Sequence, residues 1–356
     1  MRVVVAGGGT AGHIEPAMNL ADELMRRDSN TVVTALGTSR GLEVTLVPER
    51  GYALELIPAV PFPRRLNKDF VTLPWRLYQA IKQTRHILES VNADVVVGFG
   101  GYVAIPAYLA ARGRFPIVIH EANARAGLAN RVGARFAQGV AESFPGSLPR
   151  ATLTGIPLRK SIADFNRAQL RESARDYFGI TGQDPVVLVF GGSQGATHLN
   201  TVLGEVLASE KSHGVTFLHA FGTKNAAVAE ASSRYIPVPY ISRMDLAYAA
   251  SDFAICRSGA LTVTELAAVG LPACFVPLPI GNGEQSLNAA DVVSAGGSML
   301  CLDSNFDADF VCDHVIPLVK NEQERERMGA ITASLGKQDA SALLADLVST
   351  VVKRSS

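Results

Sequence analysis

Short apolar runs alternate with amphipathic helical patterns along the whole chain of 356 residues. The runs are rich in Val and Ile and are bounded by Gly, Pro or Asp, so each of them predicts a buried strand. The clearest runs cover residues 3–5, 31–36, 94–97, 116–119, 186–190, 253–255 and 272–275. Strands that alternate with helices from end to end are typical of an α/β fold with parallel sheets.

The second half of the chain repeats the motif order of the first half. Residues 8–12 and 191–195 both read Gly-Gly-[Ser/Thr]-x-Gly directly after an apolar run. The next strand ends in Ala-x-Gly-Thr in both halves, at residues 35–38 and 220–223. Several matches in the same order predict two similarly wound Rossmann-like domains, whose parallel sheets face a deep cleft that binds ligands.

These repeats divide the chain. We expect an N-terminal Rossmann-like domain over residues 1–156 and a second one over residues 185–340. Turn-rich and charged sequence predicts a linker region over residues 157–184. We expect residues 341–356 to form a C-terminal helix. One interpretation is that this helix crosses back to the N-terminal domain.

The first apolar run leads into a glycine-rich turn and a helix. The turn fits the Gly-x-Gly-x-x-Gly pattern through Gly7, Gly9 and Gly12. His13 follows directly, and Pro16 is expected near the first turn of the helix. Unpaired N–H groups and the helix dipole attract an anion to such a turn, and here an imidazole lies beside it.

The same glycine pattern occurs in dinucleotide-binding enzymes, which place an acid at the end of the second strand to hold the ribose. Here the second strand ends in Leu-Gly-Thr at residues 36–38, with no carboxylate. An NAD-dependent dehydrogenase is therefore disfavoured. Arg40 could meet a 2′-phosphate, so an NADP enzyme stays open.

Composition narrows the function classes further. The chain has 33 Lys and Arg against 33 Asp and Glu, so its formal net charge is zero and no general field attracts nucleic acid. Its four cysteines show no Cys-x-x-Cys pair, which is typical of reduced core residues. Residues 95–111 are uncharged but are interrupted by glycine and proline, so we expect neither a leader nor a transmembrane helix.

Residues 61–85 depart from this neutrality, because basic and aromatic side chains are interleaved there with a single acid. A helix from residue 73 onward would turn Trp75, Arg76, Lys82 and Arg85 outward. One interpretation is a solvated helix face, and the other is a surface that meets anionic lipid headgroups. The candidate membrane patch consists of Phe62, Arg64, Arg65, Lys68, Phe70, Trp75 and Arg76.

Two stretches of the second half carry further candidate binding residues. In residues 256–265 a strand runs into a small-residue loop with Arg257, and then into a helix whose first N–H groups can hold a diphosphate. Glu265 either accepts hydrogen bonds from ribose hydroxyls or is a first-turn acid favoured by the helix dipole. Glu284 and Gln285 either read sugar hydroxyls or begin a helix with solvated side chains.

Two patterns invite a metal interpretation that we reject. His120 and Glu121 follow the expected strand 116–119 at the rim of the cleft, but neighbours on an extended segment point apart. Asp307 and Asp309 spell Asp-x-Asp, but they lie at an apparent helix start, where acids are favoured. We expect no metal site and no cofactor.

Five long motifs resemble those of the MurG family, the peptidoglycan N-acetylglucosaminyltransferases that act on lipid I. They are GGGTAGHIEP, GFGGYVAIP, HEANARAGLANR, GGSQGA and CRSGALTVTELAAVGLP. The resemblance implies a GT-B fold and an inverting transfer of GlcNAc from UDP-GlcNAc to lipid I, giving lipid II. It also implies peripheral attachment to the anionic cytoplasmic face of the cell membrane, with proteins of cell-wall synthesis and division as partners.

On the N-terminal half, the resemblance implies that His13 is the catalytic base. The residues that would face the substrate diphosphates are Thr10, Ala11 and Gly12. Asn123 would make a polar contact with a substrate, and Arg159 would face a phosphate.

On the second half, the resemblance implies the UDP-GlcNAc site. Backbone at Ile241 would read the uracil, backbone N–H groups from Ala260 onward would hold the diphosphate, Glu265 would hold the ribose and Gln285 would read GlcNAc hydroxyls. The full set of implied binding residues here is Ser193, Ile241, Met244, Ala260, Leu261, Thr262, Glu265 and Gln285.

Two other functions stay open. One is a UDP-GlcNAc 2-epimerase-like enzyme of similar fold, which would work without an acceptor. The other is a non-catalytic protein that binds a nucleotide sugar. The chain departs from the family pattern at Ala11, Ala122, Ile156 and Glu284.

Overall fold

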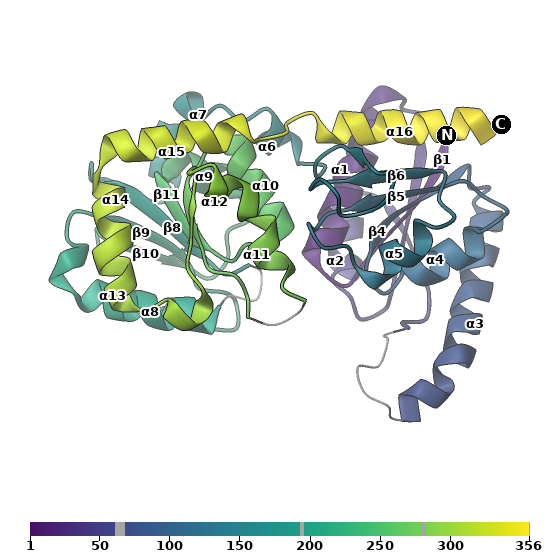
Figure 1. Cartoon of the computed structure of the whole chain (residues 1–356), viewed down its shortest axis with the longest axis horizontal. Helices are drawn as coiled ribbons and strands as arrows, with labels where there is room; N and C mark the ends of the chain where they lie inside the picture. Colours follow the sequence, from purple (N-terminus) through teal and green to yellow (C-terminus); the bar gives the residue numbers. More distant parts are fainter. Residues whose placement is uncertain (61–67, 193–195, 280–281, 356) are drawn as a thin grey trace. The chain divides into compact units, whose positions relative to one another are not determined.

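The computed structural model describes residues 1–60, 68–192, 196–279 and 282–355. These residues form two compact units (Figure 1). The first unit contains Met1–Arg159 together with Asp339–Ser356, and the second contains Lys160–Gln338. Both units alternate parallel strands with helices, as the hydrophobic pattern predicts.

The sheet of the first unit has seven parallel strands in the order β3-β2-β1-β4-β5-β6-β7. The strand β1 lies inside this sheet, and its Val5 is paired with Ala35 of β2 on one side and with Val97 of β4 on the other. The strands are β1 (Arg2–Gly7), β2 (Val32–Gly37), β3 (Ala53–Leu56), β4 (Val95–Gly100), β5 (Ile117–Glu121), β6 (Gly139–Glu142) and β7 (Thr152–Leu153).

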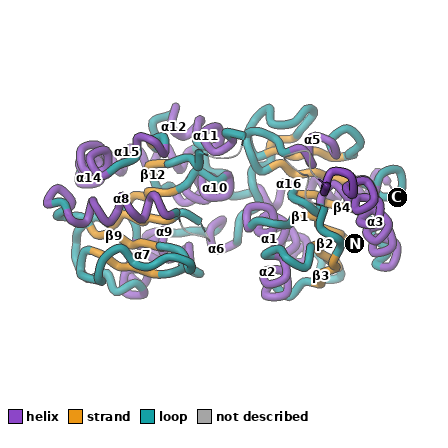
Figure 2. The backbone as a smooth tube through the Cα atoms, turned by 90° about the horizontal axis from the view of Figure 1, so that it is seen from below, coloured by secondary structure: helices purple, strands orange, loops and turns teal. Residues whose placement is uncertain are grey.

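Helices cover both faces of this sheet (Figure 2), because both faces of the central strands are apolar. Val3 and Val5 pack toward one face, and Val4 and Ala6 toward the other, as the two-residue period of a strand requires. The first face is covered by α1 (Ala11–Arg27), α2 (Glu43–Glu49) and α16 (Ala340–Ser355), and the second by α3 (Lys68–Ser90), α4 (Ala104–Ala111) and α5 (Leu128–Gly133).

The second unit repeats this winding with six parallel strands in the order β10-β9-β8-β11-β12-β13. In both sheets the first strand of the unit lies between its second and fourth strands, which confirms the two Rossmann-like domains. The strands are β8 (Val186–Phe190), β9 (Thr216–Ala220), β10 (Tyr235–Val238), β11 (Phe253–Cys256), β12 (Ala273–Phe275) and β13 (Met299–Leu300).

The helices of the second unit are mostly short. Those that matter for the candidate site are α9 (Met244–Ala250), α10 (Ala260–Val269) and α11 (Glu284–Asn288). The others are α6 (Lys160–Ala163), α7 (Arg167–Tyr177), α8 (Thr197–Ala208), α12 (Ala290–Ser294), α13 (Ala308–Phe310), α14 (Ile316–Lys320) and α15 (Glu322–Ser334).

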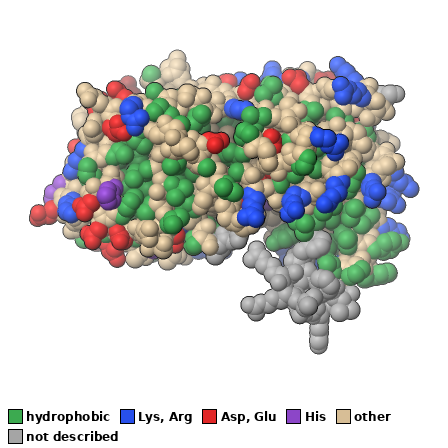
Figure 3. Space-filling view, in the orientation of Figure 1, with side chains coloured by type: hydrophobic (Ala, Val, Ile, Leu, Met, Phe, Trp, Pro, Cys, Tyr) green, Lys and Arg blue, Asp and Glu red, His purple; other side chains and the backbone are tan. Residues whose placement is uncertain are grey.

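The α3 helix carries an aromatic surface. Trp75 is 63% exposed and Tyr78 is 57% exposed, and their rings stack with centroids 5.9 Å apart. Figure 3 shows apolar side chains over α3, with Lys and Arg side chains along the face of the first unit above them. Within the described residues, no helix combines the length and the apolar character that crossing a membrane requires.

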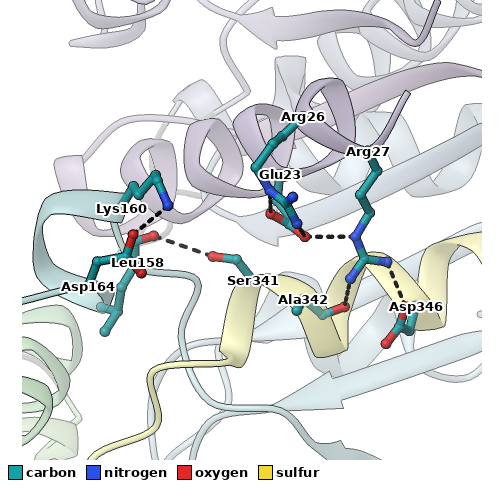
Figure 4. A network of polar contacts seen from close by, with 9 residues as sticks. All are labelled: Glu23, Arg26, Arg27, Leu158, Lys160, Asp164, Ser341, Ala342 and Asp346. Atoms are coloured by element: carbon teal, nitrogen blue, oxygen red, sulfur yellow. Dashed lines mark hydrogen bonds and ion pairs between the residues drawn. The ribbon is translucent and has the colours of Figure 1, made fainter. Parts of the chain in front are cut away.

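The α16 helix completes the core of the first unit. Leu344, Val348 and Val351 are buried in the same cluster as the apolar side of α1. Polar contacts at the surface fix the position of the helix along α1 (Figure 4): Arg27 Nη1 lies 2.6 Å from Asp346 Oδ1, and Arg27 Nη2 donates to the Ala342 carbonyl at 2.9 Å. Exposed ion pairs of this kind contribute little, so the apolar contacts supply most of the attachment.

Two buried histidines make the stability of the fold sensitive to acid. His120 Nε2 lies 2.8 Å from the Gly155 carbonyl, and His219 bridges Asn200 and Tyr235. Burial lowers the pKa of each histidine to about 4. Since an unfolded histidine titrates near its ordinary value, the unfolded state binds more protons between pH 6.5 and pH 4, and stability falls as the pH falls through this window.

We therefore expect each of these histidines to remove about 3 kcal/mol of unfolding free energy between pH 7 and pH 4. Urea unfolding as a function of pH measures this loss. A His219→Gln variant cannot take up the proton, so its stability curve should be flatter than that of the unmodified protein. Equal slopes for the two proteins would contradict the assignment to His219.

Candidate functional site

The turn between β1 and α1 places His13 on the first turn of the helix. Thr10 is extended, with φ −138° and ψ 153°, and α1 begins at Ala11. The Thr10 carbonyl accepts from the His13 N–H at 3.1 Å and from the Ile14 N–H at 3.2 Å, which closes the first turn. The expected helix start after His13 is therefore wrong, and Pro16 lies in the second turn rather than near the first.

A second glycine turn, at the end of β4, packs against the first one. Gly100 and Gly101 have φ values of +96° and +83°, a region that L side chains rarely adopt. A Cβ at Gly101 would lie 2.2 Å from the Gly8 carbonyl oxygen, and one at Gly100 would lie 3.2 Å from His13 Nε2. Glycine at both positions lets the two turns approach and brings His13 against the β4 turn.

The His13 imidazole is kept neutral by its surroundings. Its Nδ1 lies 3.1 Å from Thr10 Oγ1. Burial lowers its pKa, and a hydrogen bond to the Gly8 backbone acts in the opposite direction without reversing the shift. The positive end of α1 disfavours the cation as well. A neutral imidazole on this turn can accept a proton at pH 7.

His13 lines a cavity of about 340 Å³ in the first unit. The cavity lies at the carboxyl ends of β1, β4 and β5, where open α/β sheets bind their ligands. Most of its wall comes from the turns that follow these strands. The lining residues are Gly8, Gly9, Thr10, His13, Val60, Gly100, Gly101, Tyr102, Ile105, Glu121, Asn123, Gly127, Leu128, Ala129 and Asn130.

The β5 strand runs through His120 and Glu121, so the expectation that these residues follow the strand at a rim is wrong. Both are buried, because the strand pairs with β6 as far as Glu121. His120 points to the Gly155 carbonyl and packs against Phe99, with ring centroids 5.4 Å apart. The side chains of His120 and Glu121 therefore have different surroundings: His120 contacts Gly155 and Phe99, whereas Glu121 lines the cavity.

The Glu121 carboxylate organises the loop after β5. It accepts from the backbone N–H groups of Asn123 at 2.9 Å and Gly127 at 3.1 Å, and from Asn130 Nδ2 at 2.9 Å. Asn130 Oδ1 in turn accepts from the Tyr108 hydroxyl at 2.6 Å. Burial raises the pKa of Glu121, and these donors act against that shift. The network fixes Asn123 at the cavity wall.

Arg159 is held by a carboxylate of α1. Its Nε lies 3.1 Å and its Nη2 2.5 Å from the two carboxylate oxygens of Glu15, which is a bidentate pair. Arg50 lies 3.3 Å from the same carboxylate. Asn19 donates to the Pro157 carbonyl at 2.9 Å, so α1 also holds the backbone before Arg159.

In the second unit, the start of α10 presents the backbone N–H groups that every helix leaves without a partner inside the helix. Gly259 is the N-cap, Ala260 is buried, and Leu261 and Thr262 are half-buried. No side chain caps this helix end among the described residues. Its first N–H groups and the helix dipole form an anion-binding end.

Glu265 lies one turn further along α10. The Tyr248 hydroxyl of α9 donates to Glu265 Oε2 at 2.8 Å. Ile241 is buried just before α9, and Met244 begins that helix. Ser193 lies outside the described residues.

Arg257 is bound by the protein itself. Its side chain is only 12% exposed and forms an ion pair with Asp303. Its Nη1 also donates to the carbonyls of Val276 at 3.1 Å and Pro277 at 3.3 Å. The guanidinium therefore fastens the segment after β12 to the β11–α10 loop.

The loop before α11 is held by its own side chains. Gln285 Oε1 accepts from the Leu278 N–H at 3.0 Å, and Glu284 Oε2 accepts from the Asn282 N–H at 3.1 Å. Glu284 is the first residue of α11.

The candidate membrane patch is only partly described. Phe62, Arg64 and Arg65 lie outside the described residues, and so do the side chains of Lys68 and Phe70. Trp75 faces outward as expected. Arg76 and Arg85 are half-buried rather than outward, which corrects the expectation for both; Arg76 Nη2 donates to the Ala59 carbonyl at 2.8 Å. The hydrogen bond to the Ala59 carbonyl holds the Arg76 side chain against the protein.

The D-x-D sequence behaves as a helix start. Asp307 caps α13 by accepting from the Phe310 N–H at 2.8 Å. In the described part of the chain, no group of three His, Cys, Asp or Glu side chains could hold a metal ion.

Of the residues that line the cavity, the sequence predicts Thr10, His13 and Asn123 as site residues, and most of the others were missed. Tyr102, Gly101 and Asn130 lie inside motifs whose flanking residues had been singled out. In the sequence, Tyr102 is a large aromatic residue directly after two glycines, and this position predicts an exposed ring at a turn. Its side chain is 54% exposed at the cavity mouth.

Comparison with known proteins gives the same assignment for both units. Residues 3–142 match the glycosyltransferase family 28 N-terminal domain, and residues 186–344 match the glycosyltransferase family 28 C-terminal domain.

Two relatives are named UDP-N-acetylglucosamine–N-acetylmuramyl-(pentapeptide) pyrophosphoryl-undecaprenol N-acetylglucosamine transferase. The protein from Saccharopolyspora erythraea is 54% identical over 99% of this chain and 94% of its own length. The protein from Rhodococcus erythropolis is 52% identical over 98% of this chain and 94% of its own length. A crystal structure of MurG from Acinetobacter baumannii is similar with a TM-score of 0.77 and 30% identity, over 98% of this chain and 99% of that one.

Proposed function

This chain belongs to glycosyltransferase family 28 and, within it, to the MurG N-acetylglucosaminyltransferases, and from that premise we propose how its residues carry out the reaction. GlcNAc passes from UDP-GlcNAc to the 4-hydroxyl of the MurNAc unit of lipid I, with inversion, and lipid II is the product of this step in peptidoglycan synthesis. The observation that carries the residue roles is the cavity in which His13 lies between two glycine turns.

In this proposal the cavity of the first unit takes the acceptor. The N–H groups of Ala11 and Gly12, at the start of α1, face the acceptor diphosphate, because a helix start attracts an anion. Thr10 adds a hydroxyl beside them. Asn123, fixed by Glu121, contacts the acceptor from the opposite wall.

His13 acts as the base. A hydroxyl attacks the anomeric carbon well only if its proton leaves as the new bond forms. The neutral imidazole accepts that proton while the new carbon–oxygen bond forms, the bond to UDP breaks, and the anomeric carbon inverts. The lowered pKa of His13 keeps the accepting form populated at pH 7.

The second unit holds the donor in this proposal. The first N–H groups of α10 stabilise the charge that grows on the leaving diphosphate. Glu265, oriented by the Tyr248 hydroxyl, accepts from the ribose hydroxyls. Backbone at Ile241, next to Met244, reads the uracil, and the side-chain amide of Gln285 reads the GlcNAc hydroxyls.

Arg159 and Ser193 complete the phosphate contacts of this proposal. Arg159 faces a phosphate with a guanidinium that Glu15 orients through two hydrogen bonds. Ser193 supplies a hydroxyl from the second glycine loop. Charge stabilisation by N–H groups and arginine makes no demand for a metal ion or another cofactor.

We also propose peripheral attachment to the cytoplasmic face of the cell membrane through the α3 region. Exposed aromatic side chains next to basic ones suit the headgroup layer of an anionic membrane. The stacked, exposed Trp75 and Tyr78 support this role for the described part of the patch. Such attachment would bring the acceptor cavity to a substrate that is itself held in the membrane.

Replacing Trp75 with serine should weaken binding to vesicles of anionic phospholipid about tenfold, because the exposed indole no longer leaves water on binding. Cosedimentation with vesicles measures the loss. Turnover of a short-chain, water-soluble lipid I analogue should stay unchanged. Tyr177→Ser, which removes an equally exposed aromatic ring from α7, is the matched control and should bind as the unmodified protein does. Equal loss in both variants would argue against a local membrane patch.

The reaction itself is tested with purified protein, UDP-GlcNAc and a lipid I analogue. UDP release and a disaccharide product that appear only with the analogue support the proposal. Interconversion of UDP-GlcNAc without acceptor would favour an epimerase, and binding without turnover would favour a nucleotide-sugar-binding protein. Either of these last results would overturn the proposed function.

A further inference from the structure

A buried carboxylate lies directly behind the glycine turn that carries His13. Glu43, the first residue of α2, has 0% of its side chain exposed. Its Oε1 accepts from the Thr38 N–H at 2.8 Å and from the Thr38 hydroxyl at 3.0 Å, and its Oε2 accepts from the Gly9 N–H at 3.1 Å. One carboxylate thus connects the end of β2 with the turn after β1.

Three glycines make room for this carboxylate. A Cβ at Gly41 would lie 2.0 Å from Glu43 Oε2, and one at Gly37 would lie 2.5 Å from Glu43 Cγ. A Cβ at Gly8 would lie 3.1 Å from Glu43 Oε1. Since real Cβ atoms are not found at the two shorter distances, the backbone on both sides is shaped to enclose Glu43.

The hydrogen bond from the Gly9 N–H connects Glu43 with the residues of the turn that line the cavity. Gly9 has a φ of +87°, a conformation that glycine adopts readily, and an added Cβ would lie 3.4 Å from the Tyr102 ring. Thr10 follows it, and Thr10 Oγ1 lies 3.1 Å from His13 Nδ1. Gly9, Thr10 and His13 all line the cavity, whereas Glu43 does not.

We propose that Glu43 is a positioning residue of the transfer reaction: by holding the Gly9 N–H, its carboxylate sets the conformation of the glycine turn and thereby the orientation of Thr10 and His13 toward the acceptor. The inference rests on the proposed function for the acceptor cavity. It adds a residue that never touches a substrate, and it explains why one of the N–H groups of the turn is turned away from the anion site and toward the protein.

Glu43→Gln is the decisive variant, because it keeps the size of the side chain but replaces one acceptor oxygen by a donor. If its oxygen stays with Thr38, its NH₂ group opposes the Gly9 N–H, and the turn is released. We expect kcat to fall 10- to 100-fold, while KM for UDP-GlcNAc changes less than twofold, since the donor residues lie in the second unit. Thr38→Val is the matched control: it removes one hydrogen bond to the same carboxylate and leaves the Gly9 contact, so kcat should fall less than threefold.

A second readout does not depend on turnover. The imidazole protons of His13, followed by NMR against pH, report its pKa, and we expect Glu43→Gln but not Thr38→Val to shift this titration. If the unmodified protein shows no transfer, the proposed function fails, and the NMR titration still tests the link from Glu43 to His13.

Should Glu43→Gln fail to fold, Glu43→Asp replaces it, because the shorter carboxylate keeps its charge but cannot reach both Gly9 and Thr38. The same loss of kcat is expected there. A folded Glu43→Gln or Glu43→Asp protein with kcat within twofold of the unmodified enzyme and an unchanged His13 titration would overturn the proposal. An equal loss in Thr38→Val would do so too, because it would show a general packing role.

Discussion

Replacing His13 with alanine should lower kcat by a factor of about 10²–10⁴ and change KM for UDP-GlcNAc little, because general-base catalysis contributes in this range. The imidazole lies on the first turn of α1, against the β4 glycine turn, and lines the acceptor cavity. Removing it takes away the proton acceptor and leaves the donor contacts of the second unit in place. Steady-state kinetics with a lipid I analogue measure both constants.

The pH dependence gives an independent check of the same role. Only neutral His13 accepts a proton, so kcat falls as the pH drops through the pKa of this group. Since burial lowers that pKa below the ordinary histidine value, the unmodified enzyme should keep its activity to a lower pH than a solvent-exposed histidine would allow. In His13→Ala this acidic limb should disappear from the residual rate.

The control for His13 is His86→Ala, which removes an exposed histidine from α3. It should leave kcat and its pH dependence unchanged. If His13→Ala kept nearly the full turnover, another group would have to serve as the base. If both constants worsened together, His13 would be a binding residue instead.

Replacing Arg257 with methionine should lower the free energy of unfolding by about 3 kcal/mol or more, the usual cost of removing one partner of a buried ion pair. Methionine keeps an apolar stem of similar length but leaves Asp303 without its cation. It also removes the donor to the Val276 and Pro277 carbonyls. Urea unfolding followed by circular dichroism measures the change.

Arg114→Met is the matched control for this prediction. Arg114 Nη1 lies 3.1 Å from Glu89 Oε1, and the two side chains are 53% and 50% exposed. An exposed pair contributes about 1 kcal/mol or less, so this variant should be close to the unmodified protein. A loss below 1 kcal/mol in Arg257→Met would mean that water replaces the guanidinium at Asp303. Arg257 would then be better placed for the substrate role expected from its loop.

The fold could be predicted largely because its strands carry their own signal. Residues 95–97 and 253–255 are short apolar runs of the kind that favours a buried strand, and they lie in β4 and β11. The repeat of the glycine turns predicted two similarly wound units, since each turn marks the same point of a Rossmann-like unit, and both sheets have this winding. Helix starts were harder to predict. The Thr10 backbone carbonyl closes the first turn of α1, and no residue type in the sequence indicates such a contact.

Site residues could be predicted where residues that are neighbours in the sequence form the site. They were missed where the site depends on contacts between residues that are far apart in the sequence. His13 follows its glycine turn directly, so the motif alone located it. Glu43 lies far from Gly9 in sequence and meets it only after β2 has paired with β1, so no local pattern indicates its role. Arg257 had an unusual position in a small-residue loop, but its partner Asp303 comes from a segment that no local pattern connects to it.

The return of α16 to the first unit has a consequence for how the protein folds during synthesis. The flank of α1 and the neighbouring face of β4, β5 and β6 are covered only when Leu344, Val348 and Val351 arrive, after the whole second unit has been synthesised. During that interval the nascent chain exposes a hydrophobic strip on an otherwise assembled sheet. We expect this strip to be where chaperones engage the growing polypeptide, and premature stop codons before residue 339 to yield insoluble fragments rather than an independent amino-terminal half.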